Sequence, residues 1–429
     1  MKRGFLLVAF ILFGFAQQAK ADYQVIVRAD AGLSGLQPVC ALLLCRVVQG
    51  LDGVLGQVFL VSGPSGVDPN AFLQSLQIQI GISNAELDIG INLTQPFIND
   101  WTVPALADTR PVNYFGAIVW NGYANQPASQ VIELPTARST FNLLGSGVVG
   151  VIDTGIDPNH PALKDVVVTG YDFTRNTGGI PSELSDLTQS VSPVVDGQPT
   201  ARVNESTAAV LDENSASVLR QYTAFGHGTM VSGIIHLVAP EARIMPLKAF
   251  RADGTGYLSD IIRAVYYGTQ NGAKILNMSF STPTNSKELK RAIDIARAQG
   301  MISVASAGND GQPLWVYPAA LGNVMGIAST DYFDQRSSFS NYGMPLVWVA
   351  APGEAIVSPY PFSTYAASWG TSFSAPFVSG VASLLLSILP DSNESQAAAA
   401  ISNARTLGPD LGYGRLDVYK AIDAAGKSR

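Results

Sequence analysis

Residues of the types that perform nucleophilic catalysis occur in short motifs of this chain. Ser372 lies in Gly-Thr-Ser-Phe-Ser-Ala-Pro, residues 370–376, where a glycine turn leads into an apolar helical stretch. The free backbone N–H groups of a first helical turn favour a developing oxyanion. Because a serine hydroxyl is a poor nucleophile alone, this hypothesis requires a histidine base and a carboxylate that orients it.

The sequence contains suitable motifs for both the histidine base and the carboxylate. His227, one of three histidines, lies in Gly-His-Gly-Thr at the start of another helical stretch. Upstream, residues 148–155 read Val-Val-Gly-Val-Ile-Asp-Thr-Gly, a buried-strand pattern that ends in Asp153 and a glycine turn. Taken singly, Ser372 could be a helix N-cap, His227 a packed imidazole and Asp153 a turn former. Together they predict a nucleophile, a base and an orienting carboxylate.

In the order Asp, His, Ser, these segments resemble the subtilisin-like serine proteases, the subtilases. Ser-Ala-Gly-Asn-Asp at 306–310 resembles the segment that carries the family's oxyanion-hole asparagine, which would be Asn309. Residues 277–281 resemble the substrate-binding strand, and residues 413–417 resemble the closing segment. The resemblance runs from about residue 121 to about residue 425.

The order of the motifs also excludes rival hydrolases. An α/β-hydrolase needs Ser before Asp before His and a G-x-S-x-G elbow, which this sequence lacks. The sedolisin relatives carry a carboxylate at the base position, whereas this chain has His227 there. The resemblance therefore implies a neutral rather than a strongly acidic working pH.

The resemblance assigns a role to each catalytic position. Ser372 would attack the carbonyl, and His227 would take its proton and return it to the leaving amine. Asp153 would hold the imidazole tautomer and stabilise the imidazolium. Asn309 would donate its side-chain amide to the oxyanion, together with the backbone N–H of Ser372.

Substrate contacts follow from the same resemblance, because an extended peptide in this family pairs with backbone edges near residues 279–281 and 254–257. The residues expected to contact substrate are Ser279, Phe280, Ser281, Gly254 and Val316. Val316 stands where subtilisin has a glycine at the base of the P1 pocket, which binds the side chain on the acyl side of the cleaved bond. Its added bulk predicts a preference for medium apolar side chains over large aromatic ones.

No cofactor or metal site is expected. His160 resembles a structural position of the family, His236 lies on an apolar helical stretch as a packed side chain, and no His/Cys/Asp cluster has zinc-site spacing. In subtilisin a loop after the histidine helix helps to hold a tight calcium ion. That turn is short here, at residues 235–240, so calcium binding is possible but the usual tight site is not expected.

Length, composition and net charge limit the kinds of binding partner that the chain can have. The 429 residues can form one large catalytic domain plus a smaller unit, and 47% hydrophobic content is ample for a core. The net charge of −7 gives no electrostatic footprint for nucleic acid. We expect protein or peptide substrates, no nucleic acid and a monomer.

The first residues resemble a targeting signal. A basic start at Lys2 and Arg3, an apolar run over 5–15 and Ala-Lys-Ala at 19–21 predict a signal peptide over 1–21. The protein would then be secreted or periplasmic, with no membrane span after signal removal. The alternative is a retained membrane anchor.

Residues 22–93 predict a small α/β unit. Its expected strands are 23–28, 56–62 and 86–93, and its expected helix is 71–78, capped by Asp68. The layout resembles the ferredoxin-like inhibitory pro-domain that precedes many subtilases; the alternative is a permanent N-terminal domain. Cys40 and Cys45, the only cysteines, could be either bridged or two buried thiols.

Residues 94–125 lack periodicity and are interpreted as a linker and maturation region, followed by the catalytic domain at 126–429. Alternating patterns there predict a central, mostly parallel sheet with helices on both faces, an α/β three-layer sandwich. The expected strands are 147–152, 243–249, 274–278, 302–305 and 324–327, and the expected helices are 227–237, 258–271, 287–299 and 372–389. A polar stretch at about 175–220 is either a surface insertion beside the cleft or a disordered loop.

The sequence thus predicts a secreted serine endopeptidase, made as a zymogen, that hydrolyses peptide bonds through an acyl-enzyme. A catalytically inactive subtilase-like binding protein is the alternative.

Activity should fall as the pH drops below about 6–7, near the reference pKa of histidine, because attack by Ser372 needs a neutral His227. The measurement is kcat/KM for a peptide substrate against pH. A rate that stays high at about pH 4 would contradict the assignment of a histidine base.

Overall fold

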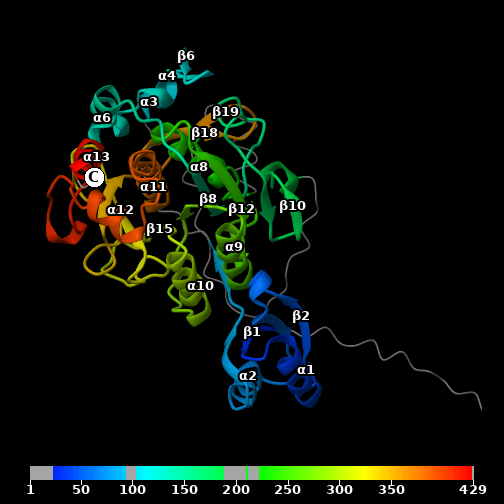
Figure 1. Ribbon diagram of the computed structural model, residues 1–429. Helices are drawn as coiled ribbons and strands as arrows, with labels where there is room; N and C mark the ends of the chain where they lie inside the picture. Colours follow the sequence, from blue (N-terminus) through cyan, green and yellow to red (C-terminus); the bar gives the residue numbers. More distant parts are fainter. Residues whose placement is uncertain (1–22, 93–102, 188–208, 211–221, 428–429) are drawn as a thin grey trace, which may run out of the picture.

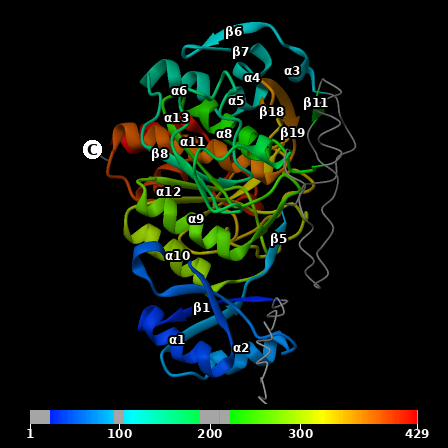
Figure 2. The same cartoon turned by 90° about the vertical axis from the view of Figure 1, so that its right-hand side faces the viewer.

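The computed structural model describes residues 23–92, 103–187, 209–210 and 222–427. The predicted signal peptide at 1–21 lies outside them. Figure 1 shows a small N-terminal unit below a larger body, and Figure 2 shows the layers of that body.

The N-terminal unit is a four-stranded antiparallel sheet with two helices. Its elements are β1 (Gln24–Ala29), α1 (Gly32–Leu43), β2 (Arg46–Gly50), β3 (Val58–Ser62), α2 (Pro69–Gln77) and β4 (Ile82–Leu87). The strand order β2-β3-β1-β4 and the βαββαβ succession are those of a ferredoxin-like fold. Asp68 caps α2 as predicted, since its side chain accepts the N–H of Ala71 at 2.9 Å.

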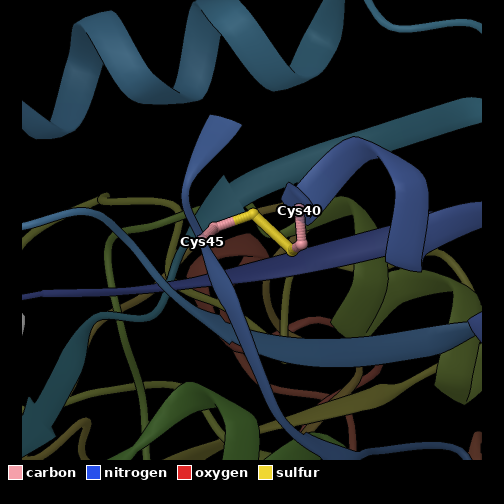
Figure 3. The surroundings of a disulfide bond; sticks show 2 residues. All are labelled: Cys40 and Cys45. Atoms are coloured by element: carbon pink, nitrogen blue, oxygen red, sulfur yellow. A yellow bond between two sulfur atoms is a disulfide. The ribbon is translucent and has the colours of Figure 1, made fainter. Parts of the chain in front are cut away.

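The two cysteines form a disulfide that closes the end of α1 (Figure 3). The Cα atoms of Cys40 and Cys45 are 4.5 Å apart, and the backbone N–H of Cys45 donates to the carbonyl of Cys40. Leu44 between them adopts a left-handed conformation that ends the helix. Of the two alternatives that the sequence leaves open, the structure shows the bridge.

The single strand expected at 86–93 is wrong, because the chain forms two strands there. β4 completes the N-terminal sheet, whereas β5 (Gly90–Asn92) leaves it and pairs antiparallel with β13 (Thr255–Tyr257) of the large body. In this pairing Ile91 lies opposite Gly256 and its side chain is buried.

The large body is built on an eight-stranded sheet of order β10-β9-β12-β8-β14-β15-β16-β17. Its strands are β8 (Val148–Asp153), β9 (Gly170–Asp172), β10 (Thr177–Gly179), β12 (Arg243–Lys248), β14 (Ile275–Met278), β15 (Ile302–Ser306), β16 (Met325–Thr330) and β17 (Val349–Pro352). All neighbours pair parallel except β10 with β9 at one edge. The predicted mostly parallel sheet is confirmed, and the five expected strands lie within three residues of their observed bounds.

Helices cover both faces of this sheet (Figure 2). α8 (His227–Val238) and α11 (Thr371–Ile388) share one apolar core, and α9 (Leu258–Gln270) and α10 (Lys287–Ala298) share another. This arrangement confirms the three-layer α/β sandwich. By length and composition α11 could cross a membrane, but 94% of that stretch is buried inside the protein, as in the core helix of a globular domain.

Further helices and strands flank these layers. They are α12 (Glu394–Ile401) and α13 (Val418–Lys427) near the C-terminus, α5 (Pro127–Val131) and α6 (Leu134–Phe141) before the sheet, and a small sheet of β11 (Ala209–Val210), β19 (Thr364–Ser368) and β18 (Ile356–Tyr360). The described residues also form three 3-10 turns: η1 (Gly53–Leu55), η2 (Glu183–Asp186) and η3 (Pro409–Leu411).

The part of the expected linker that the structure describes, 103–125, is folded. It contains α3 (Pro104–Ala107), β6 (Pro111–Tyr114), β7 (Ala117–Trp120) and α4 (Asn121–Ala124). Tyr114 and Tyr123 are buried and donate their hydroxyls to backbone carbonyls of α8. These residues therefore belong to the large body, and a linker extending to 125 is wrong.

The polar stretch at 175–220 is described only in part. Residues 175–187 form β10 and η2 against the large body, and β11 pairs with β19. Residues 188–208 and 211–221 lie outside the described part of the chain. For 175–187, the expectation of a disordered loop is wrong.

Glu394 offers a test of the fold through its buried carboxyl. Burial raises the pKa of Glu394 to about 8, against an ordinary 4.5, although its Oε2 accepts the N–H of Ser303 at 2.8 Å. The folded protein thus keeps a proton that the unfolded chain releases, and its stability falls as the pH rises from about 4.5 to 8.

We expect Glu394→Gln to unfold near the parent temperature at pH 5 and at a higher temperature at pH 8, with a stability gain of order 4 kcal/mol. Unfolding would be followed by circular dichroism in a Ser372→Ala background, which removes the expected nucleophile. The exposed Glu241→Gln is the control. A Glu394→Gln effect that is independent of pH would contradict the buried proton.

Candidate active site

Asp153 and His227 lie in direct contact at one end of the sheet. Asp153 is the last residue of β8, and His227 is the first residue of α8. His227 Nδ1 lies 2.7 Å from Asp153 Oδ1, and both side chains are buried. The backbone N–H of Thr154 donates to the same oxygen at 2.8 Å. Asp153 can therefore fix the orientation of the imidazole.

The contact depends on a glycine after the histidine. A Cβ at Gly228 would lie 2.2 Å from the carbonyl oxygen of Gly155 and 3.2 Å from Asp153 Oδ1. Gly155 itself has a φ of +104°, which L side chains rarely adopt. The two glycines let the start of α8 approach the end of β8 closely enough for the hydrogen bond.

Ser372 lies in the first turn of α11, directly after Gly370 and Thr371. Its Oγ donates to the carbonyl of Ser279 at 2.9 Å, and Ser279 Oγ donates back to the carbonyl of Ser372 at 2.8 Å. Among the described residues His227 Nε2 has no hydrogen-bond partner. The His227 ring lies 5.2 Å from the ring of Phe373, so the base and the serine segment are neighbours.

Asn309 follows β15 and contacts the residue before the serine. Its Oδ1 accepts both the backbone N–H and the hydroxyl of Thr371, each at 2.9 Å. These two bonds hold the oxygen end of the amide toward Thr371, which leaves Nδ2 as the donor end. Gly308, with a φ of +96°, makes the turn that brings Asn309 to this place.

The residues that are expected to contact substrate differ in how far their side chains are exposed. The side chains of Ser279 and Phe280 are buried, the first against Ser372 and the second against Phe250 with ring centroids 5.2 Å apart. A substrate can therefore meet these two residues only through their backbone. Ser281 is half-buried, and the next residue, Thr282, pairs with Tyr317 through two backbone hydrogen bonds.

Gly254 and Val316 lie at two further parts of the same region. Gly254, with a φ of +86°, precedes β13, the strand that β5 covers. Val316 is 5% exposed and lies beside Gly308, where its Cγ2 is 3.3 Å from the place that a Cβ on this glycine would take. Val316 is thus near the turn that positions Asn309.

A buried charged cluster beside Asp153 is not evident from the sequence. Glu183 and Asp186, both on η2, are fully buried, as is Lys248 at the end of β12. Lys248 Nζ contacts Asp186 Oδ2 at 2.8 Å, and Glu183 accepts hydrogen bonds from Thr154 and from the start of α8. The sequence could not predict this cluster, because η2 lies in the polar stretch at 175–220. Hydrophobic periodicity does not indicate which residues of that stretch are buried.

The other two histidines are structural, as expected. His160 Nε2 lies 2.9 Å from the carbonyl of Thr364, and burial lowers its pKa. His236 is buried on α8 beside the ring of Tyr114, and burial lowers its pKa to about 4. No cluster of three or more His, Cys, Asp or Glu within the described ranges could hold a metal ion.

Comparisons with known proteins identify the family of the chain. The profile of the Subtilase family matches residues 145–417. Thermitase from Thermoactinomyces vulgaris is 33% identical over 304 residues, which cover 70% of this chain and 96% of that protein. Subtilisin DY from Bacillus licheniformis is 35% identical over 272 residues, 62% of this chain and 86% of that protein.

Among solved structures, fervidolysin from Fervidobacterium pennivorans has a TM-score of 0.69 at 21% identity, over 94% of this chain and 61% of that one. A Pseudoalteromonas arctica protease has a TM-score of 0.54 at 28% identity, over 68% and 94% of the two chains. The first likeness concerns the fold alone and includes the N-terminal unit. Since both the family profile and a relative with nearly complete coverage match, the chain belongs to the subtilase family of serine endopeptidases.

Proposed function

We propose that Asp153, His227 and Ser372 form the catalytic triad of an exported endopeptidase that is made as a zymogen. One observation carries the proposal: a buried 2.7 Å contact joins His227 to Asp153 where a parallel strand ends and a helix begins. Ligand sites of open α/β sheets lie at such strand ends. The first turn of α11 supplies Ser372 to the same region.

The reaction begins when the side chain of Ser372 rotates. Ser372 Oγ leaves the carbonyl of Ser279 and donates to His227 Nε2, the ring nitrogen that Asp153 does not contact. Oγ then attacks the substrate carbonyl while Nε2 takes its proton. Asp153 stabilises the resulting imidazolium, which returns the proton to the leaving amine as the acyl-enzyme forms. Water hydrolyses the acyl-enzyme by the same steps in reverse order.

The oxyanion would be bound by two donors. The backbone N–H of Ser372 lies in the first turn of α11, where no intrahelical acceptor is available. Asn309 supplies its Nδ2 amide, because Thr371 holds its oxygen end. Each such donor contributes roughly 2.7–4 kcal/mol to the transition state.

The N-terminal unit is proposed to be the inhibitory pro-domain. Its strand β5 pairs with β13, the strand whose edge is expected to bind an extended substrate. A substrate could not pair with that edge while β5 is there. Its carboxylates also cap two helices: Glu86 accepts from the start of α10, and Asp88 accepts the N–H and hydroxyl of Ser259 at the start of α9. A buried ion pair of Arg28 with Glu288 at 2.8 Å completes the interface.

The proposal extends to specificity, export, substrate class and oligomeric state. The bulk of Val316 beside the Asn309 turn supports a P1 preference for medium apolar side chains. Export rests on the signal-like start of the sequence, and the alternatives of secretion and periplasmic retention both agree with it. The substrates would be proteins or peptides, bound by a monomer.

The first test is labelling by a fluorophosphonate probe of purified protein after removal of residues 22–93, beside Ser372→Ala. We expect labelling of the wild type and none of the variant, because the probe reacts only with an activated serine. The exposed Ser395→Ala is the matched control and should label fully. Absence of labelling in the trimmed wild type would favour an inactive binding protein.

The zymogen is tested by Glu86→Gln combined with Asp88→Asn in the full chain. Losing two caps of about 1 kcal/mol each should weaken the interface roughly 30-fold, so labelling of Ser372 should appear sooner after refolding. Asp30→Asn, an exposed carboxylate of the same unit, should label at the wild-type rate. Equal rates in all three proteins would argue against an inhibitory role of this interface.

A further inference from the structure

We propose that Glu183 is a positioning residue of this protease: its carboxylate holds Thr154 and the first turn of α8, and through them Asp153 and His227. The inference rests on the proposed triad. It gives a role in catalysis to η2, an element in the polar stretch that carries none of the triad residues.

The backbone brings Glu183 to the end of β8. Residues 181–183 pair with Ile156, which donates its N–H to the carbonyl of Pro181 and accepts the N–H of Glu183, each at 3.1 Å. Gly155 is packed tightly against this segment, because a Cβ there would lie 2.9 Å from the carbonyl of Pro181 and 3.4 Å from Glu183 Cγ. The glutamate is therefore held in place and fully buried.

One carboxylate joins both catalytic elements. Glu183 Oε1 accepts the hydroxyl of Thr154, and it shares the backbone N–H of Gly228, at 3.1 Å, with Thr154 Oγ1, at 2.9 Å. Glu183 Oε2 accepts the hydroxyl of Thr229. Thr154 follows the catalytic aspartate, and Gly228 and Thr229 follow the catalytic histidine. The carboxylate thus spans the ends of β8 and α8 through residues adjacent to the Asp153–His227 contact.

The hydroxyl of Thr154 connects Glu183 to Asp153. Its Oγ1 lies 3.2 Å from Asp153 Oδ1 and also contacts Glu183, but it has only one proton to donate. When Glu183 is ionised it accepts this proton, and Asp153 loses that donor. When Glu183 is protonated it can donate to Thr154, whose own proton then turns to Asp153. An ionised Glu183 thus leaves Asp153 more negative and favours the imidazolium.

The charged groups around Glu183 are Asp153 of β8, His227 of α8, Lys248 of β12 and Asp186 of η2. Lys248 donates to Asp186 and to the carbonyls of Thr154 and Phe250, and Arg175 also pairs with Asp186. Glu183 therefore has hydroxyl and amide donors but no direct cation partner among the described residues. Burial accordingly raises its pKa to about 7, within the range where the enzyme is expected to act.

The central variant is Glu183→Gln, which keeps the shape and resembles the protonated carboxyl. We expect kcat to fall about tenfold with KM changed less than about twofold, because Glu183 meets triad neighbours and not the substrate. The acid limb of kcat/KM should move to lower pH by about half a unit or more, because the variant lacks the charge that favours the imidazolium.

The matched control is Glu394→Gln, another buried carboxyl with a raised pKa, on α12. It should leave kcat and the pH profile unchanged. A second test is a double-mutant cycle with Thr154→Val, in which Glu183→Gln should cost less than in the wild type if the effect passes through the hydroxyl. An unchanged kcat and acid limb in Glu183→Gln, or full additivity in the cycle, overturns the proposal.

The low-field proton NMR signal of the His227 imidazole gives a readout that needs no turnover. Its titration midpoint should also move to lower pH in Glu183→Gln. If the wild type hydrolyses nothing but the midpoint still moves, the proposed function fails and the coupling stands. If the wild type is active and the midpoint does not move, the coupling fails alone.

If Glu183→Gln does not fold, the same coupling can be tested in the wild-type protein. In protein labelled with 13C at the glutamate carboxyls, the signal of Glu183 should titrate near pH 7, and the His227 signal should respond in that pH range. Burial raises the pKa of two other described glutamates, and their signals are assigned by their loss in Glu394→Gln and in Glu354→Gln. A Glu183 signal that titrates without any response of His227 overturns the proposal.

Discussion

The close approach of the end of β8 to the start of α8 is the constraint on which the rest of this protein depends. The hydrogen bond between Asp153 and His227 needs two backbone segments so near that Gly228 has no room for a Cβ. A parallel sheet supplies this geometry, since every strand of the central run ends at the same edge. The apolar core shared by α8 and α11 then brings the segment of Ser372 next to His227, whose ring lies 5.2 Å from that of Phe373. The sheet order, the two helix starts and the glycines are thus parts of one arrangement.

Much of this arrangement could be predicted because its signals are local. The apolar run of β8 and the Gly-His-Gly-Thr motif each lie within a few residues, and strand–helix alternation fixes the layers. The fold of residues 103–125 could not be predicted, for the opposite reason. Tyr114 and Tyr123 are ordered by carbonyls of α8 more than a hundred residues away, and no periodicity records such partners. The same holds for Glu183, because its donors are Thr154, which directly follows β8, and the first residues of α8.

The N-terminal unit shows how one interface can serve two purposes. Carboxylates that end its sheet satisfy the free N–H groups of α9 and α10, which would otherwise face water. The same contacts hold β5 on the edge strand β13. The sequence pattern of 86–93 could not separate these roles, since one alternating stretch holds both the end of β4 and all of β5. Stability of the unit and obstruction of the edge are therefore linked physically.

The disulfide between Cys40 and Cys45 lies wholly within that unit, and the chain has no other cysteine. Closing so short a loop stabilises by roughly 2 kcal/mol in the chain-entropy view. If the unit is removed during maturation, as proposed above, the remaining protein would contain no sulfhydryl and no bridge. Under that proposal reductants and thiol-reactive oxidants would act on cysteines of the precursor and would find none in the mature chain, so the redox state of the surroundings would matter only before maturation.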